Sequence, residues 1–358
     1  MMARRLTPRE RVERALRFAD VDHVPFTVYE CMIPQCEAER VMRNEGLCIH
    51  QRSPAPYASH SPGITSESHT FVVNGRVRTR TVVHTPEGDL TEVREPAGFT
   101  SWHVEKLFKR PEDYRPLIAM INAQQYVHSP EAWLRKRDEM GGDAIMRGSI
   151  GYEPMQAIIH TYMGVETFAI EWAERRDEVL RLYDALVENR RRLYPICAEG
   201  PCMYFNYGGN VSADVVGPQR FRDYYVPNYE EFCEVMHAAG KLVGVHFDAN
   251  TRVLADAIAQ TSLDYIEAFS PAPDTDMSVA DARAAWPEKA LWINYPSSLF
   301  LTSDERMRQA TIEMLRQAAP GNGFLIGITE DMPADRWVDG CMTINRAVQQ
   351  FGRLPIEP

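Results

Sequence analysis

His246 and Asp248 carry the clearest chemical signal in this 358-residue sequence. They end an apolar stretch, residues 240–250, which reads Gly-Lys-Leu-Val-Gly-Val-His-Phe-Asp-Ala-Asn. The pattern predicts a buried parallel strand that delivers polar groups at its carboxyl end, where α/β folds place their chemistry. Because side chains alternate along a strand, a histidine and a carboxylate two residues apart point to the same side. An imidazole beside a carboxylate can bind a metal ion or transfer a proton.

Polar residues also follow the other strands that the sequence predicts. These strands lie at 24–30, 144–150, 203–207, 265–268, 291–294 and 324–328. If all of them join one parallel sheet, their carboxyl ends face one mouth. Its carboxylates, amides and phenols would suit a cation or a hydrogen-bonding substrate. The side chains that we expect to line the mouth, besides His246 and Asp248, are Tyr29, Glu30, Arg147, Asn206, Tyr207, Glu267, Asn294 and Glu330.

Most of these residues also have a purely structural interpretation. His246 can be a hydrogen-bonded histidine at the rim of a barrel, and Asp248 can cap the helix that follows it. Glu330 can complement the N-terminus of a helix that begins near residue 334. Glu267 is harder to explain in this way, because a carboxylate at the end of an apolar strand is costly unless it is paired.

The order of the elements predicts the fold class. Apolar strands alternate with amphipathic helices from residue 111 onward, which implies right-handed βαβ units and a parallel sheet. We expect a (β/α)8 TIM-type barrel as a single domain over residues 1–358, although only seven strands are recognisable. Residues 31–63 read as one long irregular connection, which suggests a lid, a binding loop or a flexible loop. The Asn74-Gly75 turn between β-type runs predicts a small antiparallel meander, inserted at 70–95.

Net charge, cysteine spacing and the absence of several known motifs disfavour some classes of function. The net charge of −11 disfavours general binding to nucleic acid or to anionic membranes. No apolar run is long enough to span a bilayer and no secretory signal is recognisable, so we expect a cytoplasmic protein. The seven cysteines match no zinc signature, which favours free thiols. Gly208-Gly209-Asn210 lacks the spacing of a phosphate loop, and no Gly-x-Ser-x-Gly elbow occurs.

The sequence resembles the uroporphyrinogen decarboxylase superfamily, which also contains corrinoid-dependent methyltransferases. The resemblance rests on an ordered set of motifs that spans nearly the whole chain. These are Leu6-Thr7-Pro8-Arg9-Glu10-Arg11, Asp22-His23-Val24-Pro25, Thr85-Pro86-Glu87-Gly88-Asp89-Leu90, Pro218-Gln219-Arg220-Phe221 with Val226-Pro227, residues 240–248, and Gly327-Ile328-Thr329-Glu330-Asp331-Met332-Pro333. The resemblance implies a (β/α)8-type barrel with its active site at the carboxyl ends of the strands.

Two departures from the superfamily patterns favour its methyltransferase branch. The haem-pathway decarboxylase has an arginine-rich run after the first strand, where this chain has Tyr29-Glu30-Cys31-Met32. An acidic residue there would repel a polycarboxylate. Methyltransferases that act on coenzyme M hold zinc with His-x-Cys and a later Cys, whereas this chain has His246-Phe247-Asp248 and Glu330. Relatives that demethylate methoxylated aromatics or methylamines use oxygen and nitrogen ligands, which fits better.

The resemblance therefore implies a methyltransferase that moves a methyl group from a small O- or N-methylated donor to a separate corrinoid protein. We expect His246, Asp248 and Glu330 to hold zinc or to supply the acid. Two alternatives stay open. One is a metal-free decarboxylase or other lyase that holds a small acid with Arg147. The other is a non-catalytic binding protein that has kept the barrel. The sequence does not indicate an oligomeric state.

Overall fold

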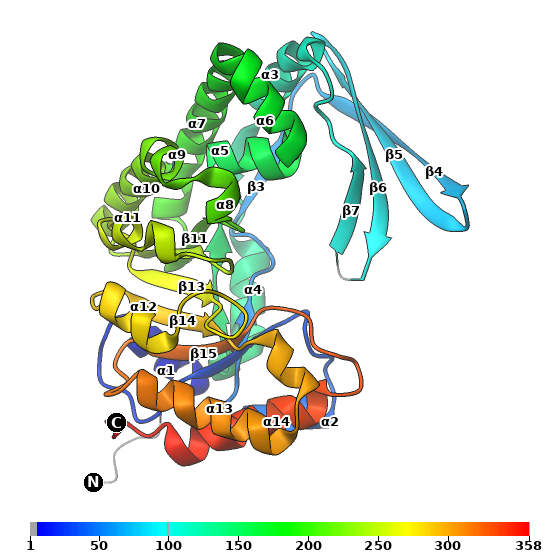
Figure 1. The fold of residues 1–358 in the computed structure, drawn as a ribbon. Helices are drawn as coiled ribbons and strands as arrows, with labels where there is room; N and C mark the ends of the chain where they lie inside the picture. The colour runs from blue at the N-terminus through cyan, green and yellow to red at the C-terminus, as the bar shows by residue number, and fades with distance from the viewer. Residues whose placement is uncertain (1–5, 99, 358) are drawn as a thin grey trace. The chain divides into compact units, whose positions relative to one another are not determined.

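A computed structural model of the chain describes residues 6–98 and 100–357. Contacts between residues divide the chain into two compact units. Figure 1 shows the helices and strands of the chain, coloured from the N-terminus to the C-terminus. Residues 1–56, 130–149 and 201–358 form the first unit, and residues 57–129 and 150–200 form the second. No helix within the described residues is long and apolar enough to cross a membrane. The expectation of one domain over 1–358 stays a prediction.

The first unit is built on a nine-stranded, wholly parallel sheet in the order β10-β11-β12-β13-β14-β15-β1-β2-β9. Only Arg147 separates β9 from β10, so both ends of the sheet belong to one run of chain and the sheet closes on itself. It therefore has eight strand positions, which confirms the predicted (β/α)8 TIM-type barrel. The strands are β1 (Phe26–Tyr29), β2 (Cys48–Gln51), β9 (Ala144–Met146), β10 (Gly148–Ser149), β11 (Tyr204–Gly209), β12 (Leu242–His246), β13 (Tyr265–Phe269), β14 (Ala290–Asn294) and β15 (Phe324–Ile328).

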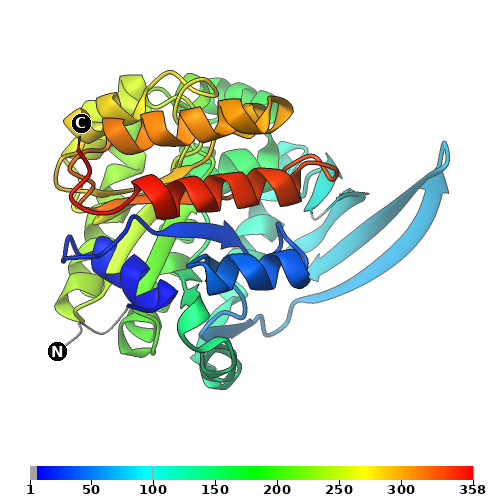
Figure 2. The same ribbon diagram turned by 90° about the horizontal axis from the view of Figure 1, so that it is seen from below.

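Helical segments connect these strands within the first unit. The long helices α13 and α14 follow β14 and β15 and lie side by side (Figure 2). Both are amphipathic and bury one face, as expected of helices on the outside of a barrel. The helical segments are α1 (Pro8–Ala15), α2 (Glu37–Asn44), α4 (Glu131–Met140), η2 (Gly141–Asp143), α8 (Ala213–Val216), α9 (Pro218–Tyr224), α10 (Val226–Ala238), η4 (Arg252–Leu254), α11 (Ala255–Ala259), α12 (Val279–Ala285), η5 (Ser297–Leu301), α13 (Asp304–Gln317) and α14 (Trp337–Phe351).

Strand β2 is the eighth strand, which the sequence did not reveal. It lies inside the segment 31–63, where we expected one irregular loop, and that expectation was wrong. The segment contains α2, β2 and β3 (Tyr57–His60). Only four residues long, Cys-Ile-His-Gln, β2 is half polar and therefore lacks the apolar run of the other strands.

Helix α1 lies at the amino-terminal ends of the strands. Thr7 and Glu10 form a capping box at its start, with Pro8 in the first helical position. Its apolar side, Val12, Ala15 and Leu16, packs into a cluster with the first inward-facing residues of several strands, among them Cys48, Tyr204, Tyr265 and Ala290. This apolar packing fills the barrel at the amino-terminal ends of the strands, so the inward-facing polar side chains lie at the carboxyl ends.

Glycine at position 244 is required by this packing. A Cβ at Gly244 would lie only 2.1 Å from the ring of Tyr265 on the neighbouring strand. The Tyr265 hydroxyl then reaches across to donate a hydrogen bond of 2.9 Å to the carbonyl of Phe205. The glycine in the middle of β12 thus makes room for a large side chain inside the barrel.

The second unit contains two small antiparallel sheets. One pairs β3 with β8 (Gln125–His128), and the other is a four-stranded meander of β4 (Thr65–Val73), β5 (Arg76–Thr85), β6 (Gly88–Ala97) and β7 (Thr100–Glu105). The predicted meander is confirmed, with Asn74 and Gly75 in the turn at φ of 49° and 76°. The helical segments of this unit are η1 (Pro111–Asp113), α3 (Tyr114–Ala123), α5 (Pro154–Gln156), η3 (Ala157–Met163), α6 (Val165–Glu174) and α7 (Arg176–Glu199).

Candidate functional site

An inward-facing polar residue lies near the carboxyl end of every barrel strand. The alternation of side chains that points Tyr265 and Trp292 into the barrel core also points Glu267 and Asn294 inward two residues later. The same alternation applies around the barrel. The set comprises Tyr29, His50, Arg147, Asn206, His246, Glu267, Asn294 and Thr329, one from each strand position.

Glu267 is the centre of this polar layer and is fully buried. Its Oε1 accepts a hydrogen bond from the Tyr29 hydroxyl, and its Oε2 accepts one of 2.9 Å from Asn206 Nδ2. The same Oε2 lies 2.8 Å from His246 Nδ1. Burial opposes ionisation of Glu267, but the charges of His246 and Arg147 outweigh it and hold the pKa of this carboxyl far below its usual range. The buried carboxylate is therefore ionised and fully engaged.

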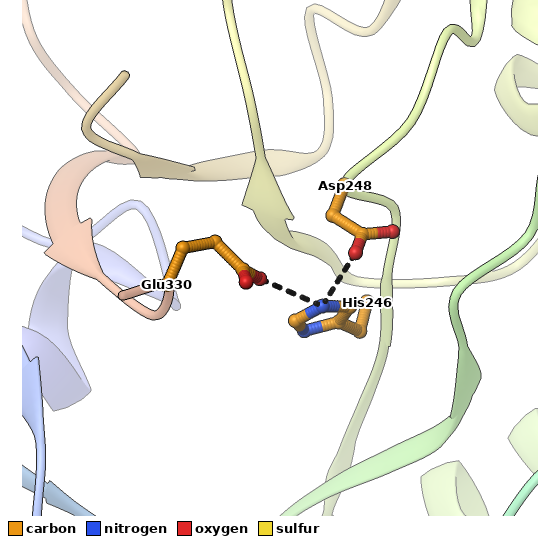
Figure 3. Close-up of side chains that lie close together, drawn as sticks. All are labelled: His246, Asp248 and Glu330. Atoms are coloured by element: carbon orange, nitrogen blue, oxygen red, sulfur yellow. Dashed lines mark ion pairs between the residues drawn. The ribbon is translucent and has the colours of Figure 1, made fainter. Parts of the chain in front are cut away.

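His246 uses its two ring nitrogens for different partners. While Nδ1 faces Glu267, Nε2 lies 3.4 Å from Asp248 Oδ2 and 3.9 Å from Glu330 Oε1 (Figure 3). Burial lowers the pKa of His246, but the negative charges of Glu267 and Asp248 outweigh it and raise that pKa well above the usual value. For Glu330, burial and the neighbouring Asp248 charge raise the carboxyl pKa. The carboxylates around His246 thus stabilise a proton on its ring.

Close backbone packing fixes the position of the imidazole. Gly209, at the end of β11, adopts φ of +156°, and a Cβ there would lie 2.8 Å from His246 Cβ. The absence of a side chain at Gly209 lets strand β11 pass directly beside the histidine. Together with the Glu267 contact, this holds the ring with Nε2 directed toward the two carboxylates.

His246, Asp248 and Glu330 fit the requirements of a metal centre. One ligand atom from each lies within 4.8 Å of the others, and no other group of three such residues occurs in the described part of the chain. His246 Nε2 and Asp248 Oδ2 lie 3.4 Å apart, within the spacing of about 3.3–3.6 Å between two ligands of a tetrahedral zinc ion, whereas Glu330 Oε1, at 3.9 Å from Nε2, would have to move closer. Glu267 on Nδ1 is the carboxylate partner that metal-binding histidines commonly have. Three protein ligands leave one position for a substrate, as in catalytic zinc sites.

Arg147 and His50 form the opposite part of the polar layer. The Arg147 Nε donates a hydrogen bond of 2.8 Å to His50 Nε2, so His50 is a neutral acceptor at that nitrogen. Burial and the Arg147 charge hold the pKa of His50 well below its usual value. The His50 ring stacks on Trp292 with centroids 4.3 Å apart, and its Nδ1 lies 3.8 Å from Glu267 Oε1. His50 therefore lies between Arg147 and the Glu267–His246 pair, with a hydrogen bond, among the described residues, to Arg147 only.

Comparison with known proteins places this site in a family. The family model described as Uroporphyrinogen decarboxylase (URO-D) matches residues 160–351, more than half of the chain. The chain belongs to the uroporphyrinogen decarboxylase family. A solved structure described as a methyltransferase from Methanosarcina mazei is similar to it over 97% of this chain and 99% of that chain, with a TM-score of 0.59 and 13% sequence identity. At that identity the likeness shows the shared fold. A search of curated proteins found no match.

The structure of this family member brings together most of the side chains expected at the mouth. His246, Asp248 and Glu330 form one group, and Tyr29, Asn206 and Glu267 form the hydrogen-bonded layer beside it. Asn294 turns its amide to neighbouring elements instead. Its Nδ2 donates to Ser270 Oγ at 3.2 Å, and its Oδ1 accepts from the Thr329 backbone N–H at 2.9 Å.

Tyr207 and Glu30 differ from what the sequence suggested. Tyr207 does not join the polar layer, because it alternates with Asn206 and packs its ring against Tyr229 and Phe232 of α10. Glu30 is not a free negative charge at the mouth, since Arg52 Nε lies 3.2 Å from its Oε2. Because it is paired with Arg52, Glu30 does not present the unpaired negative charge that was expected to repel a carboxylate.

Sequence reasoning missed His50 and Arg52, which the structure places at the site. Both follow from the unrecognised strand β2. The guanidinium of Arg52 lies over the Tyr29 ring, 3.7 Å from its centroid. The run Cys-Ile-His-Gln-Arg does show the same change from apolar to polar residues as the other strand ends. That signal was available, but only in a segment dominated by turn residues.

Proposed function

We propose that this protein is a methyltransferase that moves a methyl group from a small O- or N-methylated donor to the cobalt of a separate corrinoid protein, with zinc at His246, Asp248 and Glu330. The observation that carries the proposal is the His246 ring, held by Glu267 at Nδ1 and directed by Nε2 toward two carboxylates. Membership of the uroporphyrinogen decarboxylase family and the fold shared with a methyltransferase from Methanosarcina mazei support it.

The chemistry of methyl transfer sets a clear demand on the site. The carbon–oxygen or carbon–nitrogen bond breaks with its electron pair left on the heteroatom, which is a poor leaving group unless its charge is stabilised. Zinc, when bound, supplies a Lewis acid for that heteroatom. His246 Nε2, Asp248 and Glu330 would hold the ion, and Glu267 would keep His246 in the Nδ1–H tautomer that leaves Nε2 free.

The ligand set favours an oxygen or nitrogen leaving group over a thiol. One imidazole and two carboxylates are harder donors than the thiolates that stabilise zinc-bound sulfur. No cysteine belongs to the metal-binding group within residues 6–98 and 100–357. We therefore propose that the methyl donors are methoxylated or N-methylated compounds. We also propose that the protein acts in the cytoplasm, with a corrinoid protein as its partner.

A second candidate is a decarboxylase or other lyase that acts on a small carboxylate without metal. The raised pKa of His246 is consistent with it, because this residue would be an imidazolium at neutral pH and would carry the proton that a general acid must supply. Arg147 would then hold the substrate carboxylate. A non-catalytic barrel is the third candidate. The buried, hydrogen-bonded polar layer around Glu267 argues against it.

Metal analysis separates these candidates. Protein purified without chelator should contain about one zinc per chain, and His246→Ala should lose it while keeping the circular dichroism of the wild type. The matched control is His237→Ala, because His237 lies on α10 with its Nε2 2.8 Å from Asp264, outside the polar layer. Wild-type protein should then demethylate a panel of methoxylated and N-methylated compounds with reduced cobalamin as acceptor. Activity that survives complete removal of zinc would contradict the metal-dependent proposal.

A further inference from the structure

Arg147 is an unusual residue for the interior of a barrel. It lies between β9 and β10, faces inward, and is only 6% exposed. Of its three guanidinium nitrogens, Nε alone has a protein hydrogen-bond acceptor among residues 6–98 and 100–357, namely His50 Nε2. Burial lowers the pKa of Arg147, but the negative charge of Glu267 outweighs it and raises that pKa, so the guanidinium stays charged. Its two terminal nitrogens are therefore charged donors for which no described residue supplies a hydrogen-bond acceptor.

The acidic residues around Arg147 have hydrogen-bond or ion-pair partners other than its terminal nitrogens. Both oxygens of Glu267 already accept hydrogen bonds, from Tyr29 on one side and from Asn206 and His246 on the other. Glu30 is paired with Arg52 at 3.2 Å. Asp248 and Glu330 face His246 Nε2. Each of these carboxylates thus has a partner, whereas no described residue accepts a hydrogen bond from the terminal nitrogens of Arg147.

The geometry of the guanidinium indicates the kind of ligand. Two parallel N–H groups at the end of an arginine match the two oxygens of a carboxylate. His50 fixes the other edge of the same plane through Nε, and Trp292 holds His50 by stacking. The two terminal N–H groups of Arg147 are therefore already oriented, which reduces the conformational entropy lost when a ligand binds.

We infer that the methyl donor is itself a small carboxylic acid, whose carboxylate binds the terminal nitrogens of Arg147 while its methylated oxygen or nitrogen faces the His246 group. This inference rests on the proposed function and names the substrate class for it. One run of contacts, Arg147 to His50 to Glu267 to His246, links the two ends of the site. The substrate class is thus methoxylated or N-methylated acids in which the carboxylate is not consumed.

Binding measurements test the inference without turnover. The probes are two acids and their neutral amides: 3-methoxybenzoate with 3-methoxybenzamide, and methoxyacetate with methoxyacetamide. Titration calorimetry should show at least one acid binding about tenfold or more tightly than its amide, in zinc-loaded and in chelator-treated protein alike. Equal binding of acid and amide in both pairs would overturn the inference, because the terminal nitrogens would then be satisfied by water.

Substitutions assign the preference to Arg147. Arg147→Met should abolish the preference for the acid, whereas Arg147→Lys should keep a reduced part of it, since charge remains but the fork is lost. Arg252→Met is the matched control, because Arg252 on η4 is exposed and paired with Asp281. Should Arg147→Met fail to fold, a preference in Arg147→Lys as strong as in the wild type would overturn the inference. Loss of the preference in Arg52→Met but not at Arg147 would also overturn it.

The products distinguish this inference from the proposed function. Recovery of a demethylated acid that retains its carboxylate supports both. Methyl transfer from amides as readily as from acids would remove the carboxylate subsite and leave the methyltransferase intact. Tight binding of the acids, dependent on Arg147 but followed by loss of carbon dioxide, would overturn the methyl-donor class and favour the lyase.

Discussion

Glu267 Oε2 lies 2.8 Å from His246 Nδ1, and the two residues sit side by side on neighbouring strands β13 and β12. This contact joins a fully buried carboxylate to a histidine that also faces two further carboxylates, Asp248 and Glu330. It sets the tautomer of the ring and therefore determines which nitrogen can bind a ligand. The contact explains why a charged residue is kept at the end of an apolar strand.

Glu267→Gln should weaken zinc binding without removing any zinc ligand. The neutral amide loses the charge that supports His246, so we expect the zinc affinity to fall by about 10- to 100-fold. Competition with a chromogenic chelator measures this directly. Glu313→Gln, an exposed substitution on α13, is the matched control and should leave the affinity unchanged. An unchanged affinity in Glu267→Gln would mean that Glu267 does not orient the ligand.

Zinc affinity should increase with pH. The raised pKa of His246 means that the metal-free ring is protonated at neutral pH, and zinc must displace that proton from Nε2. Below the pKa of His246, the apparent affinity should therefore rise about tenfold for each pH unit. Chelator competition at several pH values between about 6 and 8 measures the slope. A slope of zero would show that His246 is not a ligand.

Asp22→Asn should destabilise the first unit and change its acid sensitivity. Arg11 is buried, and its Nε and Nη2 bind Asp22 at 2.6 and 2.9 Å. The side chain of Asp22 is partly exposed, so we expect a loss of about 1–2 kcal/mol in the free energy of unfolding at neutral pH. Urea denaturation measures it. The matched control is Asp20→Asn, two residues away and exposed.

The pH dependence of this pair has a defined sign. Burial raises the pKa of Asp22, but the Arg11 contact outweighs it and lowers that pKa in the folded state. Its contribution is therefore complete above the unfolded value of about 3.9 and is lost as the pH falls through the folded pKa. The difference in stability between wild type and Asp22→Asn should shrink in acid. A difference that is constant down to low pH would contradict the ion-pair explanation.

Gly244→Ala should disrupt the barrel core. The added Cβ would meet the Tyr265 ring at 2.1 Å, so we expect the free energy of unfolding to fall by about 1–3 kcal/mol or more. The double variant Gly244→Ala with Tyr265→Leu is the control, because a smaller side chain removes the clash. The cost of the alanine should be clearly smaller in that background. Equal costs in both backgrounds would show that Tyr265 is not the obstacle.

Much of the fold was predictable because local patterns specify it. The strand at 242–246, the alternation of strands and helices after residue 111 and the Asn74-Gly75 hairpin follow from apolar runs, periodicity and turn residues. Strand β2 was not predictable in this way. Its four residues carry an inward-facing histidine, and its strand conformation depends on pairing with β1 and β9 rather than on its own composition.

The sequence by itself determined that His246 and Asp248 lie on one side of a strand end, because alternation along a strand is a local property. It also marked Glu267 as a costly carboxylate that must have partners. Only the tertiary structure determined which residues those partners are. Closure of the barrel brings Glu330 to His246, Tyr29 to Glu267 and Arg147 to His50, across separations in sequence that no local pattern spans. The partners of these carboxylates, and the lack of a protein acceptor for the terminal nitrogens of Arg147 among the described residues, follow from that closure.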